Sequence, residues 1–214
     1  MRGLMGTKIG MTRVFDGEGC QVPVTVLEVG PCVVLQRKTR ETDGYEAVQC
    51  GFGEQTERRT KKPQLGHFKK ASTTPKRRIH EFHVDPDEDL KVSDVITASI
   101  FEDVTFVDVT AKSKGRGFQG VVRRHGMAGG RKTHGAHSKR GPGSIGCSAY
   151  PARVIKGKRL PGHMGHRRVT TQNLKIVQIM LEDNLVLVRG AVPGPVGAPL
   201  VITKAVKKRG AAVS

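Results

Sequence analysis

Acidic residues are missing from one long stretch of the chain. Residues 109–181 contain 16 Lys and Arg but no Asp or Glu. The other 141 residues carry 21 basic and 19 acidic side chains, so nearly all of the net charge of +18 comes from this one stretch. Clustered positive charge with a pI near 10.3 is typical of proteins that bind nucleic acid. We therefore look for the function in this stretch.

Aromatic and apolar residues are also scarce. The chain has no Trp and two Tyr, and 36% of its residues are hydrophobic. An anionic membrane would attract the charge, but the chain has no run of 18 apolar residues and the basic stretch has no amphipathic helix pattern, so we predict no membrane association. The stretch is rich in glycine and poor in apolar surface. We expect it to become ordered only against a large anionic partner.

Closely spaced cysteines are absent. The four cysteines, at positions 20, 32, 50 and 147, form no C-x-x-C pair, which excludes a zinc ribbon. The first residues show no signal-peptide core or cleavage site. We therefore expect a reduced, intracellular setting without disulfides.

Alternating patterns and short apolar runs predict strands on both sides of the basic stretch, and turn residues separate them. We predict strands at residues 21–29, 32–35, 45–52, 78–84, 104–109, 170–181, 185–188 and 200–202. Pro23 suggests that the first is an edge strand. One short helix is expected near residues 63–71, and the acidic cluster at residues 85–89 is expected to be a solvated loop. The predicted fold is mainly β, an antiparallel barrel or sandwich with little helix.

The order of these segments predicts the domain organisation. Residues 1–110 and 169–206 are expected to form one discontinuous β-barrel domain. Residues 111–168, which we call the arm, are expected to form a long, basic and largely irregular loop, and residues 207–214 a flexible tail. A loop of this length normally counts against such an assignment, but here the charge indicates that a partner orders it.

A G-x-G-x-x-G motif at residues 115–120 follows a predicted strand. A dinucleotide site would need a helix after the motif and an acidic residue about 20 positions later. No acid occurs before Glu182, and residues 123–126 are not expected to begin a helix. We instead expect the glycines to let the backbone approach phosphates that neighbouring cations neutralise.

Two H-x-x-H pairs, at residues 134–137 and 163–166, flank Cys147. The surrounding cations would repel a metal ion, and no carboxylate is present to orient the histidines. Cys147 or Ser144 could act as a nucleophile only beside an oriented base, which this sequence does not indicate. We predict no metal, no cofactor and no catalysis. The histidines are expected to stack on bases, donate to phosphates or line the arm.

Residues 141–146, with the sequence GPGSIG, lie midway along the arm. They combine a rigid proline with permissive glycines and have almost no bulk. This composition suits a tip that enters a confined space, and a plain turn is the alternative.

Several motifs occur in the same order as in a known family. They are GTKIGMT (residues 6–12), GPCVV (30–34), DGYEAVQ (43–49), SKGRGFQG (113–120), GPGSIG (141–146) and RGAVPG (189–194). Together they resemble the bacterial-type L-three family of large-subunit ribosomal proteins. The resemblance implies a translation-protein-type barrel near the subunit surface and a loop that penetrates ribosomal RNA toward the peptidyl-transferase centre.

The resemblance also implies partners and site residues. The partners would be large-subunit rRNA, bound near its 3′ end during assembly, and neighbouring proteins of the L-fourteen and L-nineteen families, with no membrane and no small-molecule substrate. The setting would be a cytoplasmic ribosome, with an organelle ribosome left open. The expected rRNA-binding residues are Lys112, Lys114, Arg116, Arg123, Arg124, Arg131, Lys132, His134, Lys139, Arg140, Arg153, Lys156, Lys158, Arg159, His163, Arg167 and Arg168. The expected tip residues are Gly143, Ser144, Ile145, Gly146, Cys147, Ser148, Ala149 and Tyr150.

Residues 147–150 depart from the common pattern of the family. Many bacterial members carry a methylated glutamine where this chain has Cys147, so that modification cannot occur here. The expected function is a structural protein of the large subunit. The alternative is a nucleic-acid chaperone or regulator that acts outside the ribosome.

Overall fold

The computed structural model describes residues 1–84 and 88–208. Within it the chain divides into two compact units. The barrel unit comprises Met1–Lys112 and the chain from Arg168 onward, and the arm unit comprises Ser113–Arg167. The predicted domain boundaries lie close to this division, but independent folding of the barrel unit stays a prediction. Asp85 and Asp87 of the predicted acidic loop, and residues 209–214 of the predicted tail, lie outside the described residues.

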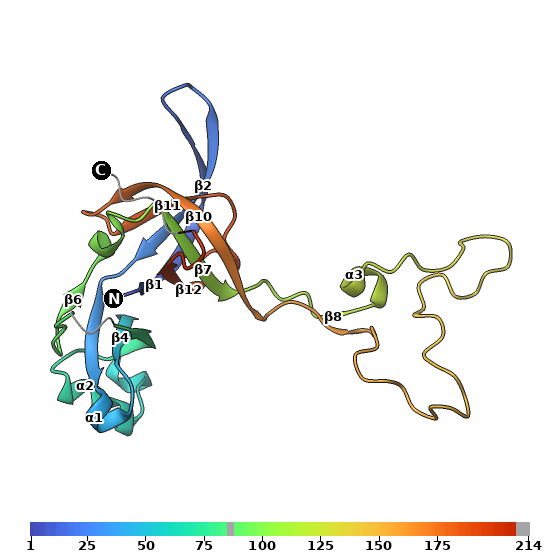
Figure 1. The fold of residues 1–214 in the computed structure, drawn as a ribbon, viewed down its shortest axis with the longest axis horizontal. Helices are drawn as coiled ribbons and strands as arrows, with labels where there is room; N and C mark the ends of the chain where they lie inside the picture. Colours follow the sequence, from blue (N-terminus) through green and yellow to red (C-terminus); the bar gives the residue numbers. More distant parts are fainter. Residues whose placement is uncertain (85–87, 209–214) are drawn as a thin grey trace. The chain divides into compact units, whose positions relative to one another are not determined.

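Among the described residues, six strands form a closed antiparallel barrel, which confirms the predicted fold class (Figure 1). Alternate residues of each strand point inward, as Val107, Val109 and Ala111 do, and the interior is filled by such side chains. The strands follow one another around the barrel in the order β1 (Gly3–Phe15), β12 (Pro199–Lys204), β7 (Phe106–Lys112), β10 (Arg168–Met180), β11 (Leu185–Arg189) and β2 (Gln21–Val29).

Strand β1 was not expected from the sequence, because glycines interrupt its apolar pattern. The structure explains them. Gly6 pairs with Leu200 on one side and with Val29 on the other. A Cβ atom at Gly6 would lie 2.2 Å from the carbonyl oxygen of Glu28. Glycine therefore allows three barrel strands to approach closely at this point.

The prediction that Pro23 marks an edge strand is wrong for β2 as a whole, because β2 lies between β1 and β11. It is correct only for the beginning of the strand. The register with β11 ends at Val24, and residues 21–23 pair in register with β1. They belong to the two-stranded ribbon drawn in blue in Figure 1. The carbonyl oxygen of Pro23 still accepts the backbone N–H of Gly190 at 2.9 Å. Proline is tolerated there because the ladder with β11 has already ended.

The predicted strands at residues 32–35, 45–52 and 78–84 lie outside the barrel. They form a separate antiparallel sheet, which in the described part of the chain has the order β5 (Lys76–His83), β4 (Ala47–Glu54), β3 (Cys32–Lys38) and β6 (Val95–Ile96). Val34, Val48 and Phe82 of this sheet share one hydrophobic core with Leu4 and Leu27 of the barrel. The sheet and the barrel therefore belong to one folded unit.

Short helices connect these strands. The predicted helix is α2 (Lys62–Lys70), and its Phe68 packs with Leu35 and Ala71. The predicted turn at residues 43–44 is the end of α1 (Arg40–Asp43), where Gly44 has a φ of 83°. Two 3₁₀ turns, η1 (Glu57–Arg59) and η2 (Ala98–Phe101), complete the connections.

The predicted solvated acidic loop is tied to the barrel unit in its described part. Glu88 pairs with the amino group of Met1. An Asp89 carboxylate oxygen lies 2.8 Å from Nη1 of Arg37. These residues therefore act as local anchors as well as balancing charge.

Two buried charged side chains hold irregular backbone in the barrel unit. The Lys8 Nζ donates to the carbonyl oxygens of Val192 at 2.8 Å and Gly194 at 3.2 Å. The Asp108 carboxylate accepts the backbone N–H of Asn173 at 2.8 Å, where the register of β10 shifts. Each charge thus satisfies backbone groups that no strand ladder reaches.

Candidate nucleic-acid interface

The arm unit begins as two paired segments. The backbone N–H of Ser113 donates to Arg167, that of Arg116 to Met164, and that of Met164 to Gly117, each at 2.9 Å. Strands β8 (Phe118–Gln119) and β9 (Gly162–His163) continue this antiparallel ladder. The two ends of the arm are therefore joined by backbone hydrogen bonds over several residues.

The expectation that no helix follows the glycine motif is wrong, because Val121–His125 form the short helix α3. Gly126, with a φ of 70°, ends the helix, and Val121 is buried. The carbonyl oxygen of Leu160, on the returning segment, accepts from Nη1 of Arg124 at 2.7 Å and lies 3.0 Å from Nε2 of His125. Local sequence gave no signal of this partner 35 residues away. A five-residue helix without a nearby acid still does not make a dinucleotide site.

Beyond α3 the arm is irregular, as predicted. Residues 126–161 form no helix or strand, and every residue from 137 to 150 is exposed. One close backbone contact shapes this region, where the N–H of Gly130 donates to Lys139 at 3.2 Å. A Cβ atom at Gly129 would lie 2.6 Å from the same carbonyl oxygen. The loop between these positions is thus closed by backbone, without an apolar core.

The structure leaves nearly all predicted binding cations and histidines exposed. The arm contains no carboxylate, so its cations have no acidic partner within it. Arg124 differs, because it is half-buried and holds α3 to the returning segment. Lys112 and Arg168 lie opposite each other on β7 and β10 of the barrel unit. The exposed members within the arm unit are Lys114, Arg116, Arg123, Arg131, Lys132, His134, Lys139, Arg140, Arg153, Lys156, Lys158, Arg159, His163 and Arg167.

The predicted tip residues are all exposed and make few contacts. Gly143 and Gly146 have positive φ angles of 73° and 152°. The Ser144 Oγ lies 3.3 Å from the carbonyl oxygen and 3.4 Å from the nitrogen of Gly146, so its hydrogen bonds are local. Ile145 is 48% exposed and Tyr150 88% exposed. This segment presents small, permissive backbone with two exposed apolar groups, and Ser144 has no base positioned beside it.

The cysteines and histidines are not gathered into a metal site within residues 1–84 and 88–208, where no cluster of three His, Cys, Asp or Glu has suitable geometry. Cys147 and Cys20 are exposed free thiols. Cys32 and Cys50 are buried, and burial raises the pKa of their thiols to about 11 and about 12. The described part of the chain also contains no helix long and apolar enough to cross a membrane.

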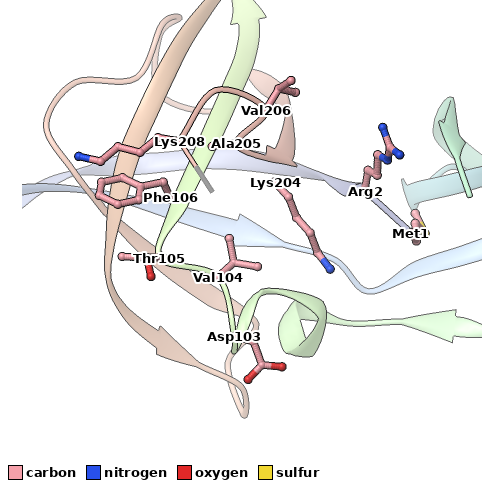
Figure 2. Close-up of a pocket in the computed structure, with 10 residues that line it drawn as sticks. All are labelled: Met1, Arg2, Asp103, Val104, Thr105, Phe106, Lys204, Ala205, Val206 and Lys208. Atoms are coloured by element: carbon pink, nitrogen blue, oxygen red, sulfur yellow. The ribbon is translucent and has the colours of Figure 1, made fainter. Parts of the chain in front are cut away.

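One pocket of about 460 Å³ lies in the barrel unit, between the first residues and the end of β12 (Figure 2). Its lining includes Arg2, Lys204 and Lys208, and the Lys208 Nζ lies 4.3 Å from the centre of the Phe106 ring. Figure 2 labels the lining residues. Among them Asp103 carries the one carboxylate, and none is a His or a Cys. The pocket therefore brings one carboxylate together with three basic side chains.

Comparisons with known proteins agree with this picture. A sequence model of the family described as "Ribosomal protein L3" matches residues 45–184. The chain is 54% identical to the large ribosomal subunit protein uL3 of Alkaliphilus metalliredigens, with 97% of this chain and 99% of the relative covered. It is 49% identical to uL3 of Brachyspira hyodysenteriae (98% and 96% covered) and 51% identical to uL3 of Corynebacterium jeikeium (97% and 95% covered). The chain belongs to the ribosomal protein L3 family.

Proposed function

We propose that this chain is a structural, RNA-binding protein of the large ribosomal subunit, without catalytic activity. The observation that carries the proposal is the arm, which has 15 Lys and Arg, no acid, and an exposed surface over residues 137–150. Such a segment has too little apolar surface to order itself, whereas RNA phosphates would neutralise it. The relatives are named as proteins of the large ribosomal subunit, which is the particle that we propose for this chain.

The two units have different tasks in this proposal. The barrel unit folds around its own core and docks on the outside of the RNA. The arm carries its cations into RNA junctions that phosphate repulsion would otherwise hold apart. Binding near the 3′ end of the large-subunit RNA would then help to nucleate assembly.

The tip is the finer part of the proposal. Residues 143–150 approach the peptidyl-transferase centre, where the absence of bulk allows close contact with RNA. Cys147 contributes there through the size and shape of its side chain, because the methylated glutamine of many family members is absent at this position. Members of the L-fourteen and L-nineteen families are the proposed neighbours of the barrel unit, in a ribosome of the bacterial cytoplasm.

The dependence of RNA binding on salt tests the proposal. A protein that neutralises six to ten phosphates loses roughly 10³–10⁵ in affinity between about 50 and 200 mM salt. We expect the full chain to show a loss of this size on bacterial large-subunit RNA. A shallow dependence would contradict phosphate neutralisation by the arm.

Sedimentation separates this function from a free chaperone or regulator. On a sucrose gradient of cell lysate, we expect one copy of the protein per large subunit and little at the top. A protein found mainly at the top would favour the alternative.

A further inference from the structure

The arm contains two aromatic residues, Phe118 and Tyr150, and both are strongly exposed. Phe118 is 75% exposed, whereas the barrel unit buries Phe68, Phe82 and Phe101 almost completely. Leaving a phenylalanine ring in water forgoes the stabilisation that burial would provide. Phe118 also occupies a defined position on a strand, which distinguishes it from a side chain on an irregular loop.

The partner of Phe118 across the ladder is His163. The two residues lie directly opposite each other in the β8–β9 pair. Opposite residues of an antiparallel pair share a face, with Cβ atoms about 4.5–5.5 Å apart. His163 is also exposed. One face of the ladder therefore carries both the phenylalanine and the histidine.

The other face of the ladder is already covered. Gly162 points there, because side chains alternate along a strand. A Cβ atom at Gly162 would lie 2.6 Å from Nη1 of Arg124, whose guanidinium also donates to Leu160. Helix α3 thus fills the face opposite Phe118 and His163. The aromatic face is the one left open by the packing of the arm itself.

We infer that Phe118 and His163 form a platform on which an unpaired base of RNA stacks. The inference rests on the proposed function, which supplies RNA as the partner, and it adds a contact to a base where the cations contact phosphates. Stacking on aromatic side chains is the usual way in which proteins hold splayed bases. Bases inside a double helix are inaccessible to such a platform, so the ligand is an unpaired nucleotide in a loop, bulge or junction.

The charges around the platform fit this ligand. Arg116 precedes Phe118 by two residues and is exposed. Arg123 contacts Gln119, which pairs with Gly162 on the covered face, so it does not lie beside the platform. Arg116 can hold a phosphate that flanks a stacked base. A protein partner would need acidic residues to match the positive charge. Binding of a protein at this face is one of the outcomes that the test below distinguishes.

The test uses the full chain bound to bacterial large-subunit RNA, with 2′-hydroxyl acylation of the RNA to report nucleotides that become constrained. Wild type is compared with Phe118→Leu, which removes the ring, and Phe118→Tyr, which keeps it. We expect wild type and Phe118→Tyr to protect the same few unpaired nucleotides, and Phe118→Leu to leave them reactive. The affinity should fall about five- to a hundredfold in Phe118→Leu, with an unchanged salt slope, because no phosphate contact is removed.

The matched control is Phe15→Leu, the same substitution at an exposed phenylalanine of the β1–β2 ribbon, 64% exposed. The Phe15→Leu variant should protect the same unpaired nucleotides as wild type. The inference is overturned if Phe118→Leu gives the reactivity map and affinity of wild type, if only base-paired nucleotides change, or if the RNA map is unchanged while binding of a neighbouring protein is lost. If the proposed function itself were wrong, the result would be different. The wild-type protein would then show a shallow dependence of affinity on salt and would protect no nucleotides.

Discussion

Single residues of the barrel unit show how far backbone geometry constrains this sequence. We expect Gly6→Ala to lower the free energy of unfolding by roughly 1–3 kcal/mol or more, because the new methyl would overlap the Glu28 carbonyl oxygen. Gly10→Ala is the matched control on the same strand. It meets no atom within 4 Å and should change stability by no more than about 0.5 kcal/mol. Urea unfolding measures both, and equal effects would contradict the close approach at Gly6.

The cysteines differ in reactivity because they differ in burial. At pH 8 a raised pKa leaves almost none of the Cys32 and Cys50 thiols ionised, and burial also blocks access. We expect Cys20 and Cys147 to react quickly with a thiol reagent, and the buried pair to react only after unfolding. Replacing Cys147 by Ser should leave one fast thiol. Four equally fast thiols would contradict the burial of the core cysteines.

At the scale of elements, α3 depends on the returning segment of the arm. We expect Arg124→Met to speed amide hydrogen exchange in α3, because the bond to Leu160 is lost. Exchange in the barrel strands should stay unchanged. Arg123→Met is the control for folding, since Arg123 is exposed and makes only a long contact to Gln119. Similar exchange in the two variants would mean that Arg124 does not hold the helix.

The elements also show what the sequence can and cannot predict. Alternation located β2 and β10, where more buried and more exposed residues alternate over part of each strand. Apolar patterns also located β7 and β11, in which three successive residues are buried. These patterns missed β1, where glycines required by neighbouring backbone erase the pattern. They could not separate barrel strands from those of the second sheet, because pairing between distant segments has no local signal. The helix α3 was missed for the same reason, since its partner is Leu160.

The candidate site was predictable in composition but less so in detail. The absence of acids defines the arm from sequence alone. It could not distinguish Arg124, which braces the arm, from the exposed cations around it. Phe118 was not among the predicted binding residues. The scarcity of aromatic residues in the arm was the available signal, but exposure had to be seen in the structure.

At the scale of the whole molecule, the two units should separate in function. We expect deletion of residues 132–158 to leave a folded barrel unit, because the core cluster contains none of these residues. The same deletion should block maturation of the large subunit. Thermal unfolding of the purified variant tests the first expectation, and sucrose gradients from cells that carry only the variant test the second. Normal subunits in those cells would show that the arm is dispensable.

The exposure of residues 137–150 has a consequence for the lifetime of the protein. Proteases that cut after Lys or Arg find Lys139 and Arg140 on an accessible backbone, in a region without helix or strand. Burial of this segment in RNA would hide both sites. We therefore expect limited trypsin digestion to cut the free protein first in the arm and to spare the copy bound to RNA. Degradation would then remove surplus copies selectively, and the amount of this protein in a cell would follow the amount of RNA available to receive it.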